Sequence, residues 1–437
     1  MKIRLFALSL AATSALGLAG CGPQPTLPPQ SGFGANPRLP APHKGLLPTV
    51  NLAEALGWPA GAGPVAAPGL QVTPYAQGLS HPRWLYVLPN GDVLVAETDG
   101  PALKPIGFRG WLERQIMKRV GAETHSPNRI VLLRGLGPDG KTASRSVFLT
   151  GLNSPFGMTL VGDTLYVADT DAVLAFPYKA GETAIAAPGV KLIDLPGGPI
   201  DHHWTKNIIA GPDGTKLYVT VGSNSNVGEN GIDAEKGRAA IWEVDRATGK
   251  SRIYASGLRN ANGMDFEPKT GALWTAVNER DELGDDLVPD YMTSVKDGAF
   301  YGWPYSYYGQ HVDTRVSPPR PDLVAKAIAP DYALGSHTAS LGLTFYRGSL
   351  LPAQYLGGAF IGQHGSWNRS KRAGYKVIFV PFQNGRPAGP PQDILTGFLS
   401  AKDQAYGRPV GVATDSTGAL LVADDVGNTI WRVTPKG

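Results

Sequence analysis

A short pattern that recurs six times along this 437-residue chain sets the strongest limit on its fold. Each copy is a turn followed by a β-rich stretch that ends in small or acidic residues, as in NGDVLVAE at 90–97. The copies lie at 90–97, 162–169, 213–220, 270–276, 357–362 and 417–424. Repeats with room for ~40–50 residues each are typical of propeller blades. The sequence therefore predicts an all-β fold, a six-bladed β-propeller whose four-stranded antiparallel blades surround a central channel.

A second signal indicates where the chain passes from one blade to the next. It reads GLSHP at 78–82, GLNSP at 151–155 and GLRN at 257–260. The ring must also close, because an open sheet edge is a template for pairing with other chains. We expect residues 71–75 to form the outer strand of the last blade, beside a strand at 429–433.

The composition agrees with many short strands joined by tight turns. Charged residues make up 17% of the chain, whereas Gly (56) and Pro (38) are frequent. A helical bundle would contain fewer of these helix-breaking residues. The formal net charge is only +4 and no long basic run is present, so nucleic-acid binding gets no support.

The first residues have the pattern of an export signal. A basic start precedes an apolar stretch at 5–18 and then LAGC at 18–21, which resembles the lipobox of bacterial lipoproteins. We expect a lipoprotein signal peptide at 1–20, a lipid on Cys21, a Pro/Gly/Ala-rich tether at 21–68 and the propeller at 69–437. This interpretation predicts a protein of the cell envelope, on the periplasmic or extracellular side, held to a membrane only by its lipid. An ordinary secretory signal with an incidental Cys is the alternative.

Two long insertions interrupt the repeats. Residues 111–120 have apolar positions at helical spacing and predict a small helical insertion, which either caps one face of the ring or lies on a membrane surface. Residues 300–309 form an aromatic run, FYGWPYSYYG. Its rings either bind the apolar faces of a sugar or pack on one another within the loop.

Several residues near the repeats could carry chemistry. His203, in a His pair before the third repeat, is suited to accept a proton, although many histidines merely pack in a core. Arg259 precedes the fourth repeat and either binds a carboxylate or ties two blades together. The acidic stretch at 278–286 offers oxygen ligands suited to calcium, or is a solvated loop. Further cations in the stretch at 364–372 and in GRPV at 407–410, which contains Arg408, would make a pocket for an anionic ligand.

Together these motifs resemble the glucose/sorbosone dehydrogenase family, and most closely its sorbosone-dehydrogenase-like branch. The resemblance runs over most of residues 70–435. The motifs that carry it are HHWT at 202–205, GLRN at 257–260, NERDELGDD at 278–286, YGWP at 301–304, SLGLTFY at 340–346 and RPV at 408–410. The resemblance implies a six-bladed propeller that oxidises a sugar, an aldose or a ketoaldose such as sorbosone, with pyrroloquinoline quinone (PQQ) and calcium. Electrons would pass to an external acceptor, a quinone pool or a cytochrome.

The resemblance also implies roles for individual residues. His203 matches the catalytic base, and Arg259 and Asn260 match an Arg-Asn pair on the cofactor, with Arg259 beside the reactive carbonyl. The backbone carbonyls of Arg280 and Asp281 match the ligands of the catalytic calcium.

Other matches are less complete. Asp285 and Asp286 stand where some family members bind a structural calcium. Arg408 matches one cofactor-binding arginine, but Tyr406 stands where a second would be.

The chain departs from the better-known glucose enzymes at two places. It has no Trp before the fifth blade to stack on the cofactor, where His337 is the candidate substitute. It also has no clear match to their cofactor-binding Lys, for which Arg369 and Lys371 are candidates. Two other functions stay open at this stage: a calcium-dependent lactonase-type hydrolase, and a propeller that binds a ligand without catalysis.

Overall fold

The computed structural model describes residues 25–43, 49–101, 126–198 and 200–437. Cys21 and the expected helix at 111–120 lie outside the described residues. Within them, the only α-helix is the short α2 (Pro321–Val324), beside the 3-10 turns η1 (Pro29–Gly32), η2 (Ile232–Glu235) and η3 (Ala353–Tyr355). No helix in this described part of the chain has the length and apolar character needed to cross a membrane.

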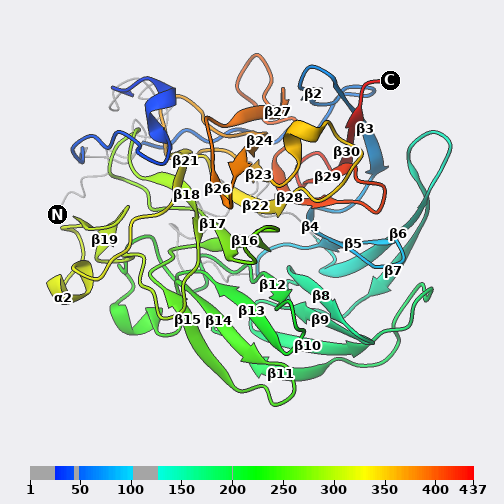
Figure 1. Ribbon diagram of the computed structural model, residues 1–437, viewed down its shortest axis with the longest axis horizontal. Coiled ribbons are helices and arrows are strands. Elements are labelled where there is room, and N and C mark those ends of the chain that lie inside the picture. The colour runs from blue at the N-terminus through cyan, green and yellow to red at the C-terminus, as the bar shows by residue number, and fades with distance from the viewer. Residues whose placement is uncertain (1–24, 44–48, 102–125, 199) are drawn as a thin grey trace, which may run out of the picture.

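Six four-stranded antiparallel blades form the body of the protein, as the repeat predicts (Figure 1). Blade 1 contains β4 (Pro82–Val87), β5 (Val93–Glu97), β6 (Arg129–Leu136) and β7 (Thr142–Leu149). Blade 2 contains β8 (Met158–Val161), β9 (Thr164–Ala168), β10 (Ala172–Pro177) and β11 (Val190–Asp194). Blade 3 contains β12 (Ile208–Ala210), β13 (Lys216–Val221), β14 (Ala240–Asp245) and β15 (Ser251–Ser256).

The remaining blades repeat this arrangement. Blade 4 contains β16 (Ala261–Phe266), β17 (Leu273–Val277), β18 (Pro289–Ser294) and β21 (Tyr332–Ser336). Blade 5 contains β22 (Ser340–Phe345), β23 (Ala359–Gln363), β24 (Lys376–Val380) and β27 (Gln392–Thr396). Blade 6 contains β28 (Pro409–Thr414), β29 (Leu420–Asp424), β30 (Thr429–Pro435) and, as its outer strand, β3 (Leu70–Gln77). Two small hairpins, β19 (Ser306–Tyr307) with β20 (His311–Val312) and β25 (Phe382–Gln383) with β26 (Arg386–Pro387), lie in the connections.

The ring closes as the sequence predicts. The N-terminal β3 pairs with the C-terminal β30 along most of its length, from Leu70 opposite Pro435 to Gln77 opposite Thr429. The first and last parts of the propeller therefore share one sheet, which closes the ring.

The recurring pattern of the sequence corresponds to the second strand of each blade. In β5 every residue is buried, because alternate side chains face opposite neighbouring blades. Leu94 and Ala96 pack with Leu165 of blade 2, whereas Val93 and Val95 pack with Leu421 of blade 6. The turn glycine before these strands has a positive φ, 87° at Gly91 and 92° at Gly418, which only glycine adopts without strain.

The described part of the expected tether lies against blades 4, 5 and 6. Its short strand β1 (Phe33–Gly34) pairs with β21, and β2 (Val65–Ala66) pairs with β27. Trp58 donates from Nε1 to the buried Asp424, with 2.7 Å between Nε1 and Oδ2, and its ring stacks on Tyr406. The low periodicity of this segment gave no indication of these contacts.

Candidate functional site

The blade topology gathers the predicted site residues at one end of the channel. Because the strands are antiparallel, the segment before the first strand of a blade and the segment after its second strand lie at the same end. His203 precedes β12, Arg259 precedes β16 and Arg408 precedes β28, whereas residues 278–286 follow β17 and residues 364–372 follow β23. We call this end of the channel the mouth.

His203 presents an unprotonated ring nitrogen. Its Nδ1 lies 2.9 Å from the Ser223 hydroxyl oxygen and 3.1 Å from the Ser223 carbonyl oxygen. The Ser223 hydroxyl donates its only proton to the Ser225 carbonyl at 2.6 Å, so both Ser223 oxygens are acceptors for His203. Nδ1 must therefore carry the proton. Burial, and then the positive charge of Arg259, hold the pKa of His203 well below its usual value, so Nε2 keeps a free lone pair at neutral pH.

Gly222, at the end of β13, lets His203 and Asn260 approach each other. A Cβ on this residue would lie 2.5 Å from the His203 Cβ and 2.7 Å from the Asn260 Oδ1. That Oδ1 is buried and has no hydrogen-bond partner in the described structure. The backbone N–H of Ser223 donates to the Arg259 carbonyl at 2.8 Å. The end of β13 thus brings His203, Asn260 and Arg259 together, as the family resemblance implies.

Arg259 is buried and is held by a set of carbonyl oxygens. Its Nη1 donates to the carbonyl of Glu279 at 2.7 Å, and its Nε donates to the carbonyl of Asn226 at 3.1 Å. Its Nη2 donates to the Asn226 side chain at 2.9 Å and lies 3.4 Å from Asp281 Oδ2. The guanidinium is fixed in place, with one carboxylate beside it.

His337, the candidate substitute for the missing Trp, contacts the loop after β17 through both ring nitrogens. Its Nδ1 lies 3.1 Å from Asp281 Oδ1, and its Nε2 lies 2.9 Å from the Gly284 carbonyl. Both partners are acceptors, so both ring nitrogens must donate and the ring is a cation. Although burial alone lowers it, the hydrogen bond to Asp281 raises the pKa of His337 above its usual value. His337 therefore holds the loop after β17, with both ring nitrogens engaged by protein groups.

The loop after β17 also fastens the aromatic insertion. The buried Arg280 donates to the carbonyls of Pro304 at 2.8 Å and Ser306 at 2.6 Å, and it pairs with Glu279 and Asp313. The rings of the insertion are themselves buried: Tyr301, Trp303, Tyr305, Tyr307 and Tyr308. This burial favours the self-packing alternative over a sugar-binding surface.

The predicted calcium ligands are partly engaged by protein groups. The Asp281 carbonyl accepts from Arg315 Nη1 at 2.9 Å. Asp286 pairs with Arg369 at 3.2 Å and accepts hydrogen bonds from the backbone of residues 26 and 27. Asp285 keeps one buried oxygen without a partner. The described residues contain no group of three or more His, Cys, Asp or Glu side chains arranged to hold a metal ion.

The cations predicted late in the chain divide into two kinds. Arg369 and Arg408 are buried, and the Nε of each has no hydrogen-bond partner in the described structure. Arg408 also donates to the Ala53 carbonyl at 3.3 Å and lies over the ring of Tyr375. Lys371, in contrast, is exposed.

Three further groups at the mouth were not singled out from the sequence: His81, Arg83 and Asp425. Asp425 Oδ2 accepts from His364 Nε2 at 2.8 Å and from Arg83 Nη1 at 2.9 Å, and it lies 3.5 Å from His81 Nε2. Asp425 directly follows the second strand of its blade, as does His364, which begins the cationic stretch at 364–372. That position is the signal that could have identified Asp425.

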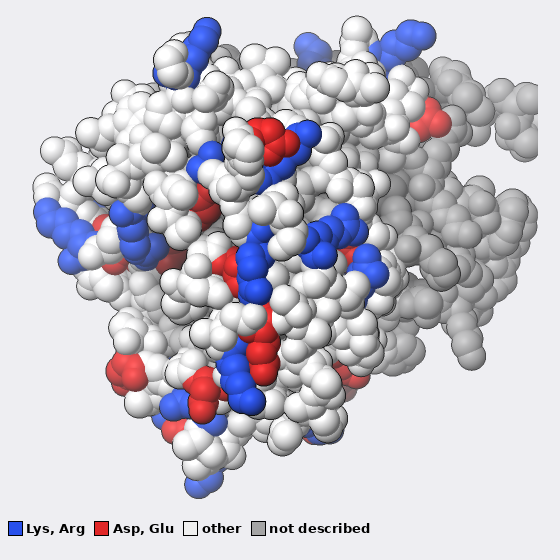
Figure 2. Space-filling view, turned by 90° about the vertical axis from the view of Figure 1, so that its right-hand side faces the viewer, with Lys and Arg blue, Asp and Glu red and all other residues white. Residues whose placement is uncertain are grey.

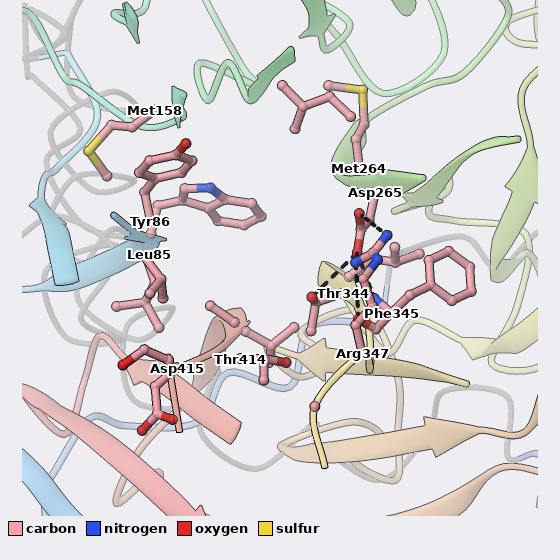
Figure 3. Close-up of a pocket in the computed structure, with 18 of the residues that line it drawn as sticks. Leu85, Tyr86, Met158, Met264, Asp265, Thr344, Phe345, Arg347, Thr414 and Asp415 are labelled. Atoms are coloured by element: carbon pink, nitrogen blue, oxygen red, sulfur yellow. Dashed lines mark hydrogen bonds and ion pairs between the residues drawn. The ribbon is translucent and has the colours of Figure 1, made fainter. Parts of the chain in front are cut away.

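A cavity of about 610 Å³ lies at the opposite end of the channel (Figure 3). Tyr86 and Met158 line one side, and Met264, Asp265 and Arg347 line the other. Arg347 and Asp265 form an ion pair in the cavity wall, with 2.8 Å between Nη1 and Oδ2. The unpaired buried polar atoms of the predicted site lie at the mouth instead, so we place the candidate site there.

On the outer face drawn in Figure 2, acidic and basic side chains are interspersed in small groups.

Comparison with known proteins identifies relatives of this chain. A model of the glucose/sorbosone dehydrogenase family matches residues 168–366, and a TrAA12-like model matches residues 323–436. An uncharacterised protein of Borreliella burgdorferi is 31% identical over 304 residues, 67% of this chain and 79% of that protein. A PQQ-dependent pyranose dehydrogenase of Coprinopsis cinerea is 23% identical over 300 residues, 53% of this chain but only 39% of that enzyme.

Solved structures share the fold. The calcium structure of a family AA12 carbohydrate-active enzyme from Trichoderma reesei has a TM-score of 0.69 at 18% identity, covering 89% of this chain and 99% of that one. The holo form of the pyranose dehydrogenase PQQ domain from Coprinopsis cinerea has a TM-score of 0.67 at 19% identity, covering 88% of this chain and 100% of that one. At these identities the two structures support the fold alone.

Proposed function

The chain belongs to the glucose/sorbosone dehydrogenase family, and from this we propose that it oxidises a sugar with PQQ as its cofactor. The observation that carries the proposal is the mouth itself, where a neutral histidine lies beside Asn260 and Arg259. We propose an aldose or a ketoaldose as the substrate. An external quinone pool or a cytochrome would then receive the electrons.

The residues of the mouth fit a polar, anionic cofactor. Three of the residues predicted to bind it, Asn260, Arg369 and Arg408, each have a buried polar atom without a partner. Leaving such an atom unpaired costs about 1–3 kcal/mol, and a bound ligand would remove that cost. These three residues and Arg259 would hold PQQ, which supplies the two-electron oxidant when it is bound.

His203 is the proposed base. Its Nε2 lone pair accepts the proton of the sugar hydroxyl, while Ser223 holds the protonated Nδ1 and fixes the ring. Arg259 places a fixed positive charge at the mouth. That charge would stabilise negative charge that develops on the bound oxidant. Because five donor contacts hold Arg259 in place, this stabilisation requires no reorganisation of the side chain.

We also propose that the protein binds calcium. The Asp281 carbonyl, one of the two predicted ligands, accepts a hydrogen bond from Arg315, and its second lone pair could bind the ion. No step of the mechanism is assigned to calcium. A calcium structure of a family AA12 enzyme with this fold is the reason to include the ion in a reconstitution.

We also propose that the protein is a lipoprotein of the cell envelope, anchored through Cys21. The support is the LAGC motif at 18–21 after an apolar stretch. Metabolic labelling with a fatty acid analogue should modify the wild-type chain but not a Cys21→Ser variant. Labelling of both forms would contradict the anchor.

The proposed activity is tested by reconstitution. The purified protein is loaded with PQQ, with and without calcium, and dye reduction is followed with a panel of aldoses and ketoaldoses. We expect activity that needs PQQ and falls by ~10²-fold or more in a His203→Ala variant. The matched control is His202→Ala, since His202 is adjacent but exposed. Failure to bind PQQ would overturn the proposal and favour a lactonase or a non-catalytic propeller.

A further inference from the structure

The N-terminal segment is tied to the mouth at a point close to the proposed lipid. Thr26 and Leu27 donate from their backbone N–H groups to Asp286 Oδ2, at 2.7 Å and 3.1 Å. Asp286 belongs to the loop after β17, which lies at the mouth. Thr26 follows Cys21 by only five positions in the sequence, and five extended residues span at most ~18 Å. A lipid on Cys21 would therefore keep this side of the mouth close to the membrane surface.

Two exposed apolar residues lie beside each other on the rim of the mouth. Trp367 follows β23 and is 39% exposed, and Val50 in the N-terminal segment is 54% exposed. The chain segments that carry them are hydrogen bonded to each other. The backbone N–H of Asn51 donates to the Trp367 carbonyl at 2.8 Å, and the side chain of Asn368 donates to the Thr49 carbonyl at 2.5 Å. We call Val50 and Trp367 the rim pair.

The rim pair and the tie to the lipid belong to one part of the mouth. Arg369, two residues after Trp367, pairs with Asp286 at 3.2 Å, and this is the carboxylate that also holds Thr26. Lys371, in the same loop as Trp367, is exposed. Surfaces that rest on a bilayer combine aromatic and aliphatic side chains with cations. An indole ring suits the boundary itself, since it has an apolar body and a polar N–H.

We propose that the rim pair and Lys371 dock this side of the mouth on a membrane surface that contains anionic lipids. This inference goes beyond the proposed sugar oxidation and rests on the proposed lipid anchor of Cys21. Val50 and Trp367 enter the interfacial layer, and the Lys371 ammonium lies among the lipid phosphates. His203 belongs to blade 3, which blade 4 separates from the loop of Trp367 on blade 5. Docking therefore covers a different part of the rim from the one beside the proposed base.

Depth measurements with spin labels test the docking on the full lipidated protein. Cys21 is the only cysteine of the chain and its thiol is blocked by the lipid, so the cysteine of a Val50→Cys variant can be labelled alone. The matched control is Leu356→Cys. Leu356 is 61% exposed and lies between β22 and β23, at the end of the channel opposite the mouth. Both proteins are bound to vesicles of equimolar phosphatidylcholine and phosphatidylglycerol.

The two labels should respond differently to the vesicles. We expect the label at position 50 to lose accessibility to a water-soluble nickel complex by about fivefold or more, and to gain accessibility to oxygen, because it enters the interfacial layer. The label at position 356 should keep its accessibility to both. Equal behaviour of the two labels on vesicles would overturn the docking, even with the lipid in place. Absence of a lipid on Cys21 would overturn it as well, because the docking depends on that anchor.

A second variant separates docking from anchoring. Trp367→Asp places a charge in the interface but leaves the lipid on Cys21, so the protein should stay on the vesicles while the label at position 50 returns to water. Trp367→Phe keeps an aromatic ring and should preserve most of the protection. Protection that survives Trp367→Asp would contradict the role of the rim pair.

The docking and the proposed oxidation are measured separately. PQQ-dependent dye reduction should be the same in Trp367→Asp as in the wild type, which also shows that the variant is folded. If the wild type reduces no dye with any sugar, the proposed activity fails, whereas the result for the labels still decides the docking.

Discussion

At the scale of single residues, the mouth contains two neutral histidines whose protons are set by different partners. His203 donates to the oxygens of Ser223, which are uncharged, whereas His364 donates to the carboxylate of Asp425. Both rings therefore have a lone pair on the nitrogen that their partner does not contact. Such hydrogen bonds decide which nitrogen of a histidine is available for chemistry.

The first residue-scale prediction concerns Ser223. Replacement by Ala removes the hydroxyl but leaves the Ser223 carbonyl as an acceptor for Nδ1, so the His203 ring keeps its tautomer and loses part of its orientation. We expect kcat to fall by about threefold to tenfold, a fraction of the ~10²–10⁴ that a general base contributes. Affinity for PQQ, measured by fluorescence titration, should not change. Ser223→Thr keeps a hydroxyl and should restore most of the rate; a Thr variant as slow as Ala would argue against an orienting role.

A second residue-scale prediction concerns Asp169, which follows β9. Burial raises its pKa to about 7, and one of its carboxylate oxygens has no partner. The folded state therefore holds a proton that the unfolded state has already lost above about pH 4. The stability that the protonated Asp169 contributes to the folded state is complete below about pH 4, and it is lost as pH rises through about 7.

Asp169→Asn resembles the protonated form at every pH. We expect the variant to be more stable than the wild type at pH 8, by about 1–3 kcal/mol, and similar to it at pH 4. Urea unfolding at the two pH values measures the difference. A variant less stable than the wild type at pH 8 would show that the ionised carboxylate is satisfied by a group not yet identified.

At the scale of elements, the blades could be predicted but the N-terminal segment could not. Each blade repeats a turn glycine and a largely buried second strand, and this repetition is visible as a pattern in the sequence. The segment at 49–68 contacts the propeller through single groups, such as Arg372 donating to the carbonyls of residues 51 and 52. Contacts of this kind do not recur at a fixed spacing, so they produce no periodic pattern in the sequence.

The prediction at this scale concerns Trp58. Its ring contacts Phe398, Tyr406 and Trp431, and its Nε1 donates to the buried Asp424. Replacement of a large packed aromatic residue by Ala costs about 3–5 kcal/mol. We expect Trp58→Ala to lower the free energy of unfolding by about 3 kcal/mol. The control in the same segment is Leu56→Ala, where the side chain is 51% exposed and the change should stay within about 0.5 kcal/mol. Equal effects of the two variants would mean that the segment does not stabilise the propeller.

At the scale of the whole molecule, the topology explains which parts of the site were found. The residues preceding a first strand and those following a second strand converge at the mouth, so His203, Arg259 and Arg408 could be brought together from their places beside the repeats. Asp425 occupies an equivalent place after β29, but it is a single residue at a strand end with no motif around it. The contacts of His337 were also beyond sequence reasoning, because its partner Asp281 lies 56 residues earlier in the chain.

The central claim is that this propeller uses His203 as the base of a PQQ-dependent sugar oxidation. The most direct measurement is a single-turnover experiment in which PQQ-loaded protein is mixed with an excess of sugar and reduction of the bound cofactor is followed by its absorbance. We predict rapid reduction in the wild type and in His202→Ala, and reduction slower by ~10²-fold or more in His203→Ala. Equal rates in the wild type and in His203→Ala, with PQQ bound in both, would contradict the account.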